Sequence, residues 1–289
     1  MTDLALPPCG PAPMPAAAAP ADHLTPLPLY TLGFRGYTVH GVECILPPLC
    51  AVPAGEFLLG SDKRQDSGTY DEDLEAYDNE LPQHRLTLLA FQVARFPVTV
   101  AEYAYFVRAG QKQPNNWQSQ LTKLDHPVVS VSWHNAADYV AWLAKTTSQP
   151  WRLPSEAEWE KAARWDGRTA RIYPWGDTFD QSRCNTSESG IKATTPVGSY
   201  PSGASPCGAQ EMAGNVWEWT RSVYKPYPYI LTDGREAHNS TDNRVLRGGS
   251  WYDYAGDARA AFRVNLRPDF SSSFGSIGVR LVLAASAGS

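Results

Sequence analysis

Cysteine and histidine are the side chains of this chain that could supply nucleophilic, redox or metal chemistry. The six histidines show no H-x-x-x-H spacing, and His84, His126 and His134 are expected to be packed, hydrogen-bonded side chains. The sequence has no G-x-S-x-G elbow, no P-loop and no G-x-G-x-x-G run. No C-x-x-C pair occurs, and we expect mostly reduced, buried thiols at Cys9, Cys44, Cys50, Cys184 and Cys207.

The segment 246–282 has a different chemical character, because aromatic and serine residues stand between the runs LRGGSW and GVRLV. Tyrosine and phenylalanine provide large contact areas at low entropic cost, and serine provides adaptable hydrogen bonds. An alternative is a core strand followed by a serine-rich loop. The two interpretations are balanced for Phe262 and Val264, whereas residues 252–254 and 270–274 are expected to be exposed. We predict a ligand-binding surface formed by Tyr252, Asp253, Tyr254, Phe262, Val264, Leu266, Phe270, Ser271, Ser272, Ser273 and Phe274.

Composition narrows the possible partners and locations. The chain has 289 residues, a formal charge of -5 and a pI of about 5.7, so it lacks the basic surface that phosphate backbones require. We therefore expect no nucleic acid partner. No apolar run approaches the roughly 20 residues needed to span a bilayer, and the N-terminal stretch lacks the features of a secretory signal. We expect a cytoplasmic protein without membrane insertion, with surface display by a non-standard route as the alternative.

The elements that must position the surface form one folded domain after a low-complexity tail. Residues 1–26 are rich in proline and alanine and are predicted to be disordered, and residues 27–289 are predicted to form a single domain. The acidic stretch 61–84 is predicted to be a solvated loop. Beyond Gly167, about 120 residues show hardly any helical period, so an additional constraint must hold them. Three helices are signalled by capping residues at Thr99, Ser132 and Ser155.

Six short runs occur in a specific order along the chain. The runs are RLPSEAEWEKAAR (152–164), YPWGD (173–177), TTPVGSYP (194–201), EMAGNVWEW (211–219), LRGGSW (246–251) and GVRLV (278–282). Together they resemble the formylglycine-generating-enzyme (sulfatase-modifying factor) family, and the resemblance covers about residues 50–283. It implies an α+β domain that elaborates the C-type lectin fold, with few regular elements and with bound calcium.

The resemblance implies two structural calcium sites. Carboxylates and backbone carbonyls suit this hard cation, which takes six to eight oxygen ligands. Without the resemblance, Glu218 would be interpreted as a surface acid and its neighbours as tight turns. The first site falls on Glu211, Gly214, Val216 and Glu218. The second, where Ser189 replaces the carboxylate of the family, falls on Asn185, Thr186, Ser189 and Ile191.

The resemblance also indicates where the chemistry of the family would lie. Its oxidases use two cysteines five residues apart, shortly after the RGG-S motif, and these positions are Asp253 and Ala258 here. Neither side chain can act as a thiolate ligand or nucleophile, and Cys184 and Cys207 are interpreted as small buried hydrophobic residues. We therefore expect no redox metal and no enzymatic activity. The alternative is an oxidase or an enzyme-maturation or regulatory factor that acts with another centre.

In character the chain is most similar to the variable proteins of diversity-generating retroelements. In that group the segment between RGGSW and a GFR-like end is rewritten at adenines, often in asparagine codons, which can yield the residue types found here. The resulting hypothesis is a calcium-stabilised binding protein that presents a hypervariable surface. Its partner is expected to be a macromolecule, a protein rather than a glycan, because aromatic surfaces suit broad interfaces.

Overall fold

The computed structural model describes residues 26–62, 78–272 and 274–284. The predicted disordered tail, apart from Pro26, and most of the acidic stretch 61–84 lie outside these ranges. The helices and strands are α1 (Leu27–Thr31), β1 (Arg35–Val39), β2 (Val42–Leu46), β3 (Leu49–Val52), β4 (Gly55–Leu59), η1 (Asp78–Glu80), β5 (His84–Leu88), β6 (Phe91–Ala94), α2 (Val100–Arg108), α3 (Trp117–Gln120), α4 (Trp133–Thr147), β7 (Trp151–Arg152), α5 (Glu156–Arg164), η2 (Gln181–Arg183), η3 (Ser187–Ser189), η4 (Pro201–Gly203), β8 (Trp217–Val223), β9 (Arg244–Arg247), β10 (Arg263–Leu266), β11 (Ile277–Val279) and β12 (Val282–Ala284).

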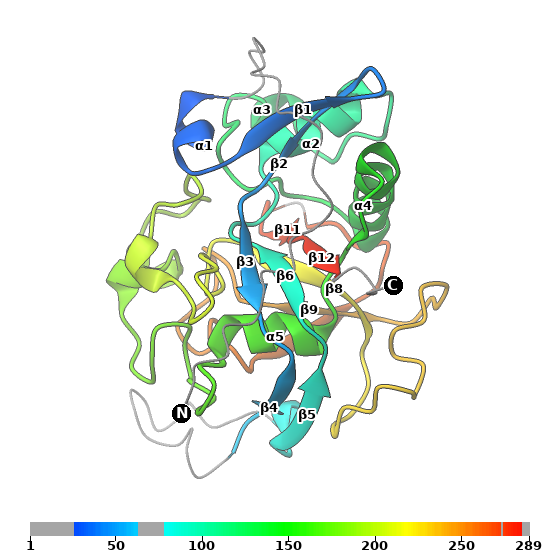
Figure 1. Ribbon diagram of the computed structural model, residues 1–289. Helices are drawn as coiled ribbons and strands as arrows, with labels where there is room; N and C mark the ends of the chain where they lie inside the picture. Colours follow the sequence, from blue (N-terminus) through cyan, green and yellow to red (C-terminus); the bar gives the residue numbers. More distant parts are fainter. Residues whose placement is uncertain (1–25, 63–77, 273, 285–289) are drawn as a thin grey trace, which may run out of the picture.

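Two four-stranded sheets form the centre of the fold (Figure 1). In the order β3-β6-β12-β7, the last described strand lies between β6 and β7. In the order β10-β9-β8-β11, β11 runs parallel to β8 and the other pairs are antiparallel. The strands β1 and β2, and β4 and β5, form separate hairpins. Since β11 and β12 are neighbours in the chain but belong to different sheets, the end of the domain joins the two sheets.

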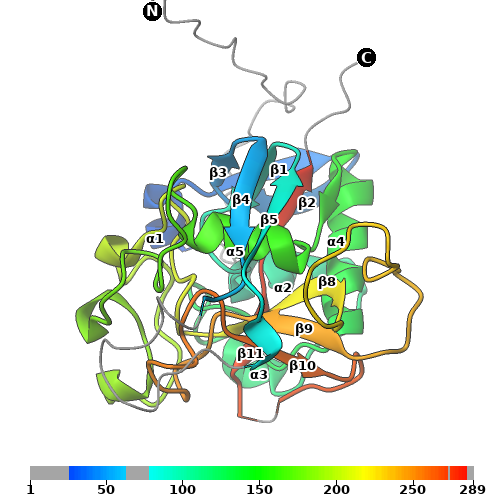
Figure 2. The same ribbon diagram turned by 90° about the horizontal axis from the view of Figure 1, so that it is seen from below.

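The three predicted helices are present, and each begins at its predicted cap. The side chains of Thr99 and Ser155 form full capping boxes with glutamates at the third helical position. Ser132 forms the same arrangement with Asn135. The helix α5 packs against β4, β8 and β9, so it connects the β4–β5 pair to the sheet that contains β8 and β9 (Figure 2). The α+β class is therefore confirmed, and the short helices α1 and α3 are additions that sequence periodicity cannot detect.

Buried arginines hold the loop-rich half of the domain together. The guanidinium of Arg244 donates to the carbonyls of four residues, and that of Arg280 donates to the carbonyls of four others. Both side chains are fully buried. Backbone carbonyls inside a protein need donors, and one guanidinium offers five. Arginine thus provides part of the additional constraint that the loop-rich half beyond Gly167 requires.

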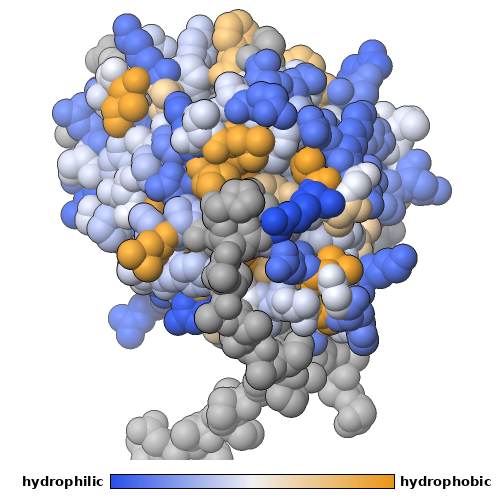
Figure 3. Space-filling model, turned by 90° about the horizontal axis from the view of Figure 1, so that it is seen from above, coloured by the Kyte–Doolittle hydropathy of each residue, from blue (hydrophilic) through white to orange (hydrophobic). Residues whose placement is uncertain are grey.

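The surface seen from above in Figure 1 is of mixed character. Where described residues are visible on this face, the patches of hydrophobic residues are small and are separated by hydrophilic residues (Figure 3). Within residues 26–62, 78–272 and 274–284, no helix has the length and apolarity that a membrane crossing requires.

Candidate ligand-binding site

Four aromatic side chains between residues 252 and 274 project into solvent. In the described part of the chain they are the only exposed Phe, Tyr or Trp side chains. The rings of Tyr252 and Phe274 stack, with centroids 6.1 Å apart and an interplanar angle of 16°. Their predicted exposure is observed, while their predicted role in binding stays a prediction. We define the aromatic surface as Tyr252 (64% exposed), Tyr254 (68%), Phe270 (45%) and Phe274 (75%).

Partly buried hydrogen bonds fix the two loops that carry the aromatic surface. The indole N–H of Trp251 donates to the carbonyl of Gly275 at 3.1 Å, which joins the start of one loop to the end of the other. The carboxylate of Asp253 accepts from the indole of Trp217 at 2.8 Å and from the hydroxyl of Ser250. Burial raises the pKa of Asp253, and these hydrogen bonds oppose that shift. Asp253 was predicted to contact ligand, but its carboxylate anchors the loop.

Three predicted contact residues face the interior. Phe262 is buried in the main hydrophobic core, where its ring lies 5.9 Å from that of Trp217, so its assignment to the surface was wrong. Val264 and Leu266 are half-buried and pack against the same core. Residues two apart along a strand point to one face, so these two in β10 and Phe262 just before it share the inner side.

The serine-rich run is only partly exposed. Ser272 is buried, and its hydroxyl lies 3.3 Å from that of Ser276 and accepts the backbone N–H of Phe274. Its predicted contact with ligand is therefore wrong. Ser271 is half-buried and accepts a hydrogen bond from Asn115 at 3.1 Å. Ser273 lies outside the described residues.

Protein donors already engage both carboxylates of the first predicted calcium site. The carboxylate of Glu218 is fully buried and accepts from the guanidinium of Arg280 at 2.8–3.0 Å and from the indole of Trp159 at 2.6 Å. Glu211 accepts from the backbone of Gly198 and from Asn215, and burial raises its pKa to about 7. The guanidinium of Arg280 already neutralises the carboxylate of Glu218, so these residues fit the ion poorly.

The predicted residues of the second calcium site lie together but offer no carboxylate. Asn185 and Thr186 are buried, and the amide oxygen of Asn185 accepts from the hydroxyl of Ser189 at 2.9 Å. Ile191 is exposed. Among residues 26–62, 78–272 and 274–284, no cluster of three or more His, Cys, Asp or Glu side chains could hold a metal ion. Calcium binding therefore stays an untested prediction.

One of the two positions that correspond to the thiols of the family, Ala258, lies close to a real thiol. Ala258 is buried and packs in one cluster with Cys184, which the sequence analysis had not placed there. Burial raises the pKa of the Cys184 thiol to about 12, so it is protonated and unreactive at neutral pH. Its interpretation as a buried hydrophobic residue is confirmed.

Two of the three expected histidines are hydrogen-bonded. Both ring nitrogens of His84 have partners, the carbonyl of Pro82 and the backbone N–H of Tyr229. His126 lies 3.0 Å from the hydroxyl of Thr194. His134 was expected to be packed and hydrogen-bonded, but it is exposed, with its ring 5.5 Å from that of Trp133.

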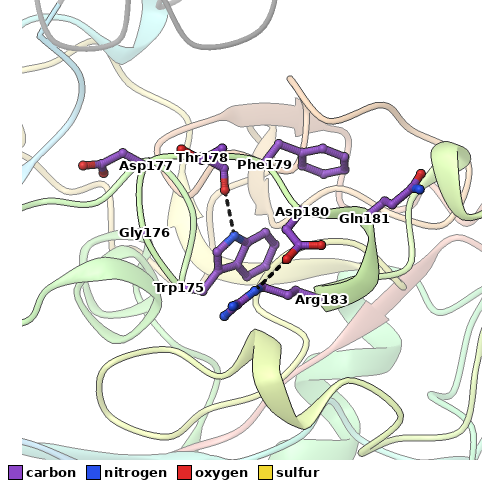
Figure 4. Close-up of a pocket in the computed structure, with 8 residues that line it drawn as sticks. All are labelled: Trp175, Gly176, Asp177, Thr178, Phe179, Asp180, Gln181 and Arg183. Carbon is purple, nitrogen blue, oxygen red and sulfur yellow. Dashed lines mark hydrogen bonds and ion pairs between the residues drawn. The ribbon is translucent and has the colours of Figure 1, made fainter.

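A hollow of about 710 Å³ that was not predicted from the sequence is lined by residues 175–181 and Arg183, which include the last three residues of the YPWGD run. The indole of Trp175 donates to the carbonyl of Thr178, and Arg183 pairs with Asp180 at 2.9 Å (Figure 4). The ring of Tyr173 stacks on that of Trp175 at 5.4 Å, and its hydroxyl donates to the carbonyl of Ala255. The hollow is therefore linked to the loop that carries Tyr254. Three aromatic and three charged residues within 173–183 were the signal available in the sequence.

Comparisons with known proteins agree with this fold. The family model described as "Sulfatase-modifying factor enzyme 1-like domain" matches residues 42–285. Hercynine oxygenase of Mycolicibacterium thermoresistibile is 36% identical over 228 residues, which cover 65% of this chain and 50% of that protein. Formylglycine-generating enzyme of Streptomyces coelicolor is 32% identical over 292 residues, covering 79% and 87%. The chain spans about half the length of the hercynine oxygenases it matches.

Two solved structures share the architecture. PvdO from Pseudomonas aeruginosa superposes with a TM-score of 0.67 at 27% identity, over 82% of this chain and 94% of that one. Treponema denticola variable protein 1 superposes with a TM-score of 0.64 at 21% identity, over 90% and 100%. The second likeness shows the fold alone. Together these findings confirm the predicted family resemblance and fold.

The expectation that the chain is not an enzyme is wrong. Relatives that are 33–36% identical are named hercynine oxygenase, and another at 32% is named formylglycine-generating enzyme. The expectation rested on Asp253 and Ala258, the two positions where one branch of the family carries its thiols, and on the absence of an H-x-x-x-H spacing, a G-x-S-x-G elbow, a P-loop and a G-x-G-x-x-G run. The lack of one set of catalytic residues does not define the chemistry of a whole family.

Proposed function

The chain belongs to the sulfatase-modifying factor enzyme 1-like family, and we propose that it binds a protein ligand through the aromatic surface. The observation that carries this proposal is the placement of the four exposed aromatic side chains within one segment of 23 residues, 252–274. Exposed aromatic groups lower the solubility of a protein, and they recur where proteins bind partners. Two of them, Tyr252 and Phe274, are already stacked, so less conformational entropy is lost on binding.

The test is a selection of binders from a displayed library of random peptides, followed by fluorescence polarisation with a selected peptide. Replacing Tyr252, Tyr254 and Phe270 together with alanine should weaken binding by about 100-fold or more, because central aromatic contacts each contribute about tenfold or more. The matched control replaces three exposed apolar residues elsewhere, Leu27, Leu89 and Ile230, with alanine. This control should bind as the wild type does, and both variants should keep the melting temperature. Wild-type affinity in the aromatic triple variant refutes the proposal.

A second candidate function follows from the named relatives. Since the chain matches about half of each hercynine oxygenase, we propose that it can serve as the substrate-holding part of an oxidising enzyme whose redox centre is supplied elsewhere. Asp253 and Ala258 provide no thiolate for such a centre. Copper and iron content of the purified protein, measured with oxygen consumption in the presence of a cysteine-containing peptide, tests this candidate. A stoichiometric redox metal in this chain would contradict a centre supplied elsewhere.

We further propose that the segment 246–282 is diversified. The support is its residue types and the rigid frame around them, since the exposed side chains can change without altering buried contacts. The sequence of the DNA that neighbours the gene tests this proposal. We expect a near-copy of this segment, rich in adenine at the divergent positions, beside a gene for a reverse transcriptase. A genome without that near-copy contradicts diversification and leaves the binding proposal standing.

A further inference from the structure

A second hollow, of about 470 Å³, adjoins the aromatic surface. Trp251, Phe274 and Gly275 form one of its walls, and the segments 116–130 and 192–194 provide most of the rest. Resting on the proposed function, we propose that this hollow receives an acidic side chain of the bound protein, an aspartate or a glutamate. The aromatic surface would then supply affinity, and the hollow would supply the choice of ligand.

The charged side chains that line the hollow are positive. Its lining includes Lys123 and Lys192 but no aspartate or glutamate, although the whole chain has a net charge of -5. The carboxylate of Asp125 lies outside the lining, and both lysines are exposed. A local excess of positive charge on an acidic protein attracts a carboxylate and repels a second basic group.

Three residues that line the hollow have an unusual backbone conformation. Seven non-glycine residues in the described chain have φ in the left-handed region, and three of them line this hollow. They are Asn116 (φ 56°), Ser130 (58°) and Lys192 (59°). Asparagine adopts this conformation fairly often, but serine and lysine seldom do, because their Cβ atoms crowd the backbone. Such conformations persist where a specific placement is needed, and here they direct the walls of one hollow.

Hydrogen bonds make the hollow rigid before any ligand arrives. The side-chain amide of Gln120 donates to the carbonyls of Asn115 and Val129 and accepts the backbone N–H of Val129. His126 contacts Thr194, which joins the two lysine-bearing segments. Because Asn115 also donates to Ser271, the rim of the hollow is tied to the loop of the aromatic surface. A preformed site of this kind loses little entropy when it binds.

The experiment extends the peptide selection to three proteins. These are the wild type, the double variant Lys123→Gln/Lys192→Gln, and the control Lys145→Gln, an exposed lysine on α4 outside the hollow. We expect aspartate and glutamate to be enriched among peptides selected by the wild type and the control, and this enrichment to vanish with the double variant. For an acidic peptide, each lysine should contribute about two- to fivefold in affinity, as exposed ion pairs do, and high salt should reduce that contribution.

The outcomes separate the two proposals. If selected peptides depend on the aromatic surface but show no acidic preference, or if the double variant keeps that preference, the hollow does not receive a carboxylate. If no selected peptide depends on Tyr252, Tyr254 and Phe270, the proposed binding function itself fails. Acidic peptides that bind the wild type and the aromatic triple variant equally would place the acidic site apart from the aromatic surface and overturn the link between them.

Discussion

Replacing Arg280 with methionine tests the interpretation that buried arginines, rather than calcium, balance the charges in the C-terminal half. Arg280 follows β11 directly, and its guanidinium contacts both carboxylate oxygens of Glu218. The same guanidinium donates to the carbonyls of Ala94, Arg95, Gln210 and Glu211. Methionine fills similar space but provides neither the charge nor the donors.

The expected magnitude follows from these contacts. Removing one partner of a buried ion pair costs about 3–5 kcal/mol, because the other charge remains uncompensated. Four carbonyls lose their donors as well, at about 1 kcal/mol each where no water replaces them. We therefore expect the free energy of unfolding to fall by about 5 kcal/mol or more, which approaches the whole stability of many domains.

The assay is urea denaturation monitored by tryptophan fluorescence, since the chain has ten tryptophans. Arg280→Lys keeps the charge but loses the planar fork, so an intermediate loss is expected and a folded protein remains measurable. Arg267→Met is the matched control, because Arg267 forms an exposed pair with Asp269 at 2.9 Å. That variant should change the stability by no more than about 0.5 kcal/mol.

A double-mutant cycle with Glu218→Gln gives the decisive comparison. If Arg280 balances Glu218, the two single losses of unfolding free energy should not add. The loss in the double variant Arg280→Met/Glu218→Gln should be smaller than their sum by about 2 kcal/mol or more. Additive losses, or an Arg280→Met variant as stable as the Arg267→Met control, would refute the reasoning.

Three further predictions rest on other parts of the molecule. Excess EDTA should leave the melting temperature unchanged, because Arg280 already neutralises Glu218; a fall that added calcium reverses would restore the first calcium site. Phe262→Ala should cost about 3–5 kcal/mol and Tyr254→Ala no more than about 0.5 kcal/mol in urea denaturation, and equal losses would contradict their burial. Burial raises the pKa of Glu102 from 4.5 to about 8, so between these values the folded protein binds a proton that the unfolded chain has lost, and stability falls as pH rises. Glu102→Gln should flatten that pH profile, and an unchanged slope in the variant would disprove the assignment.

Features set by neighbouring residues could be predicted from the sequence. The caps at Thr99, Ser132 and Ser155 act over three positions, so the chain itself shows where α2, α4 and α5 begin. The order of the six motifs was equally informative, because it reflects a whole fold and not one contact.

Features set by distant residues could not be predicted. The pair of Arg259 and Glu80 joins residues 179 positions apart, and no local pattern shows that either charge is buried. The burial of Phe262 was in principle accessible, since Phe262, Val264 and Leu266 alternate as one face of a strand does. The surface and core interpretations were balanced for Phe262 because this spacing was not used, and Phe262 was listed with the contact residues.

The buried ion pairs explain how a changeable surface can rest on a fixed fold. Four arginines within the segment 246–282 each pair with a glutamate that lies outside it and is fully buried. Uncompensated charges in the interior are costly, so each pair holds its stretch of the segment in one position. The exposed aromatic side chains between these anchors make few of the contacts that fix the backbone. Substitutions of them should therefore alter binding more than stability, whereas substitutions of the anchors should alter stability first. The anchoring pairs are Arg247 with Glu160, Arg259 with Glu80, Arg263 with Glu156 and Arg280 with Glu218.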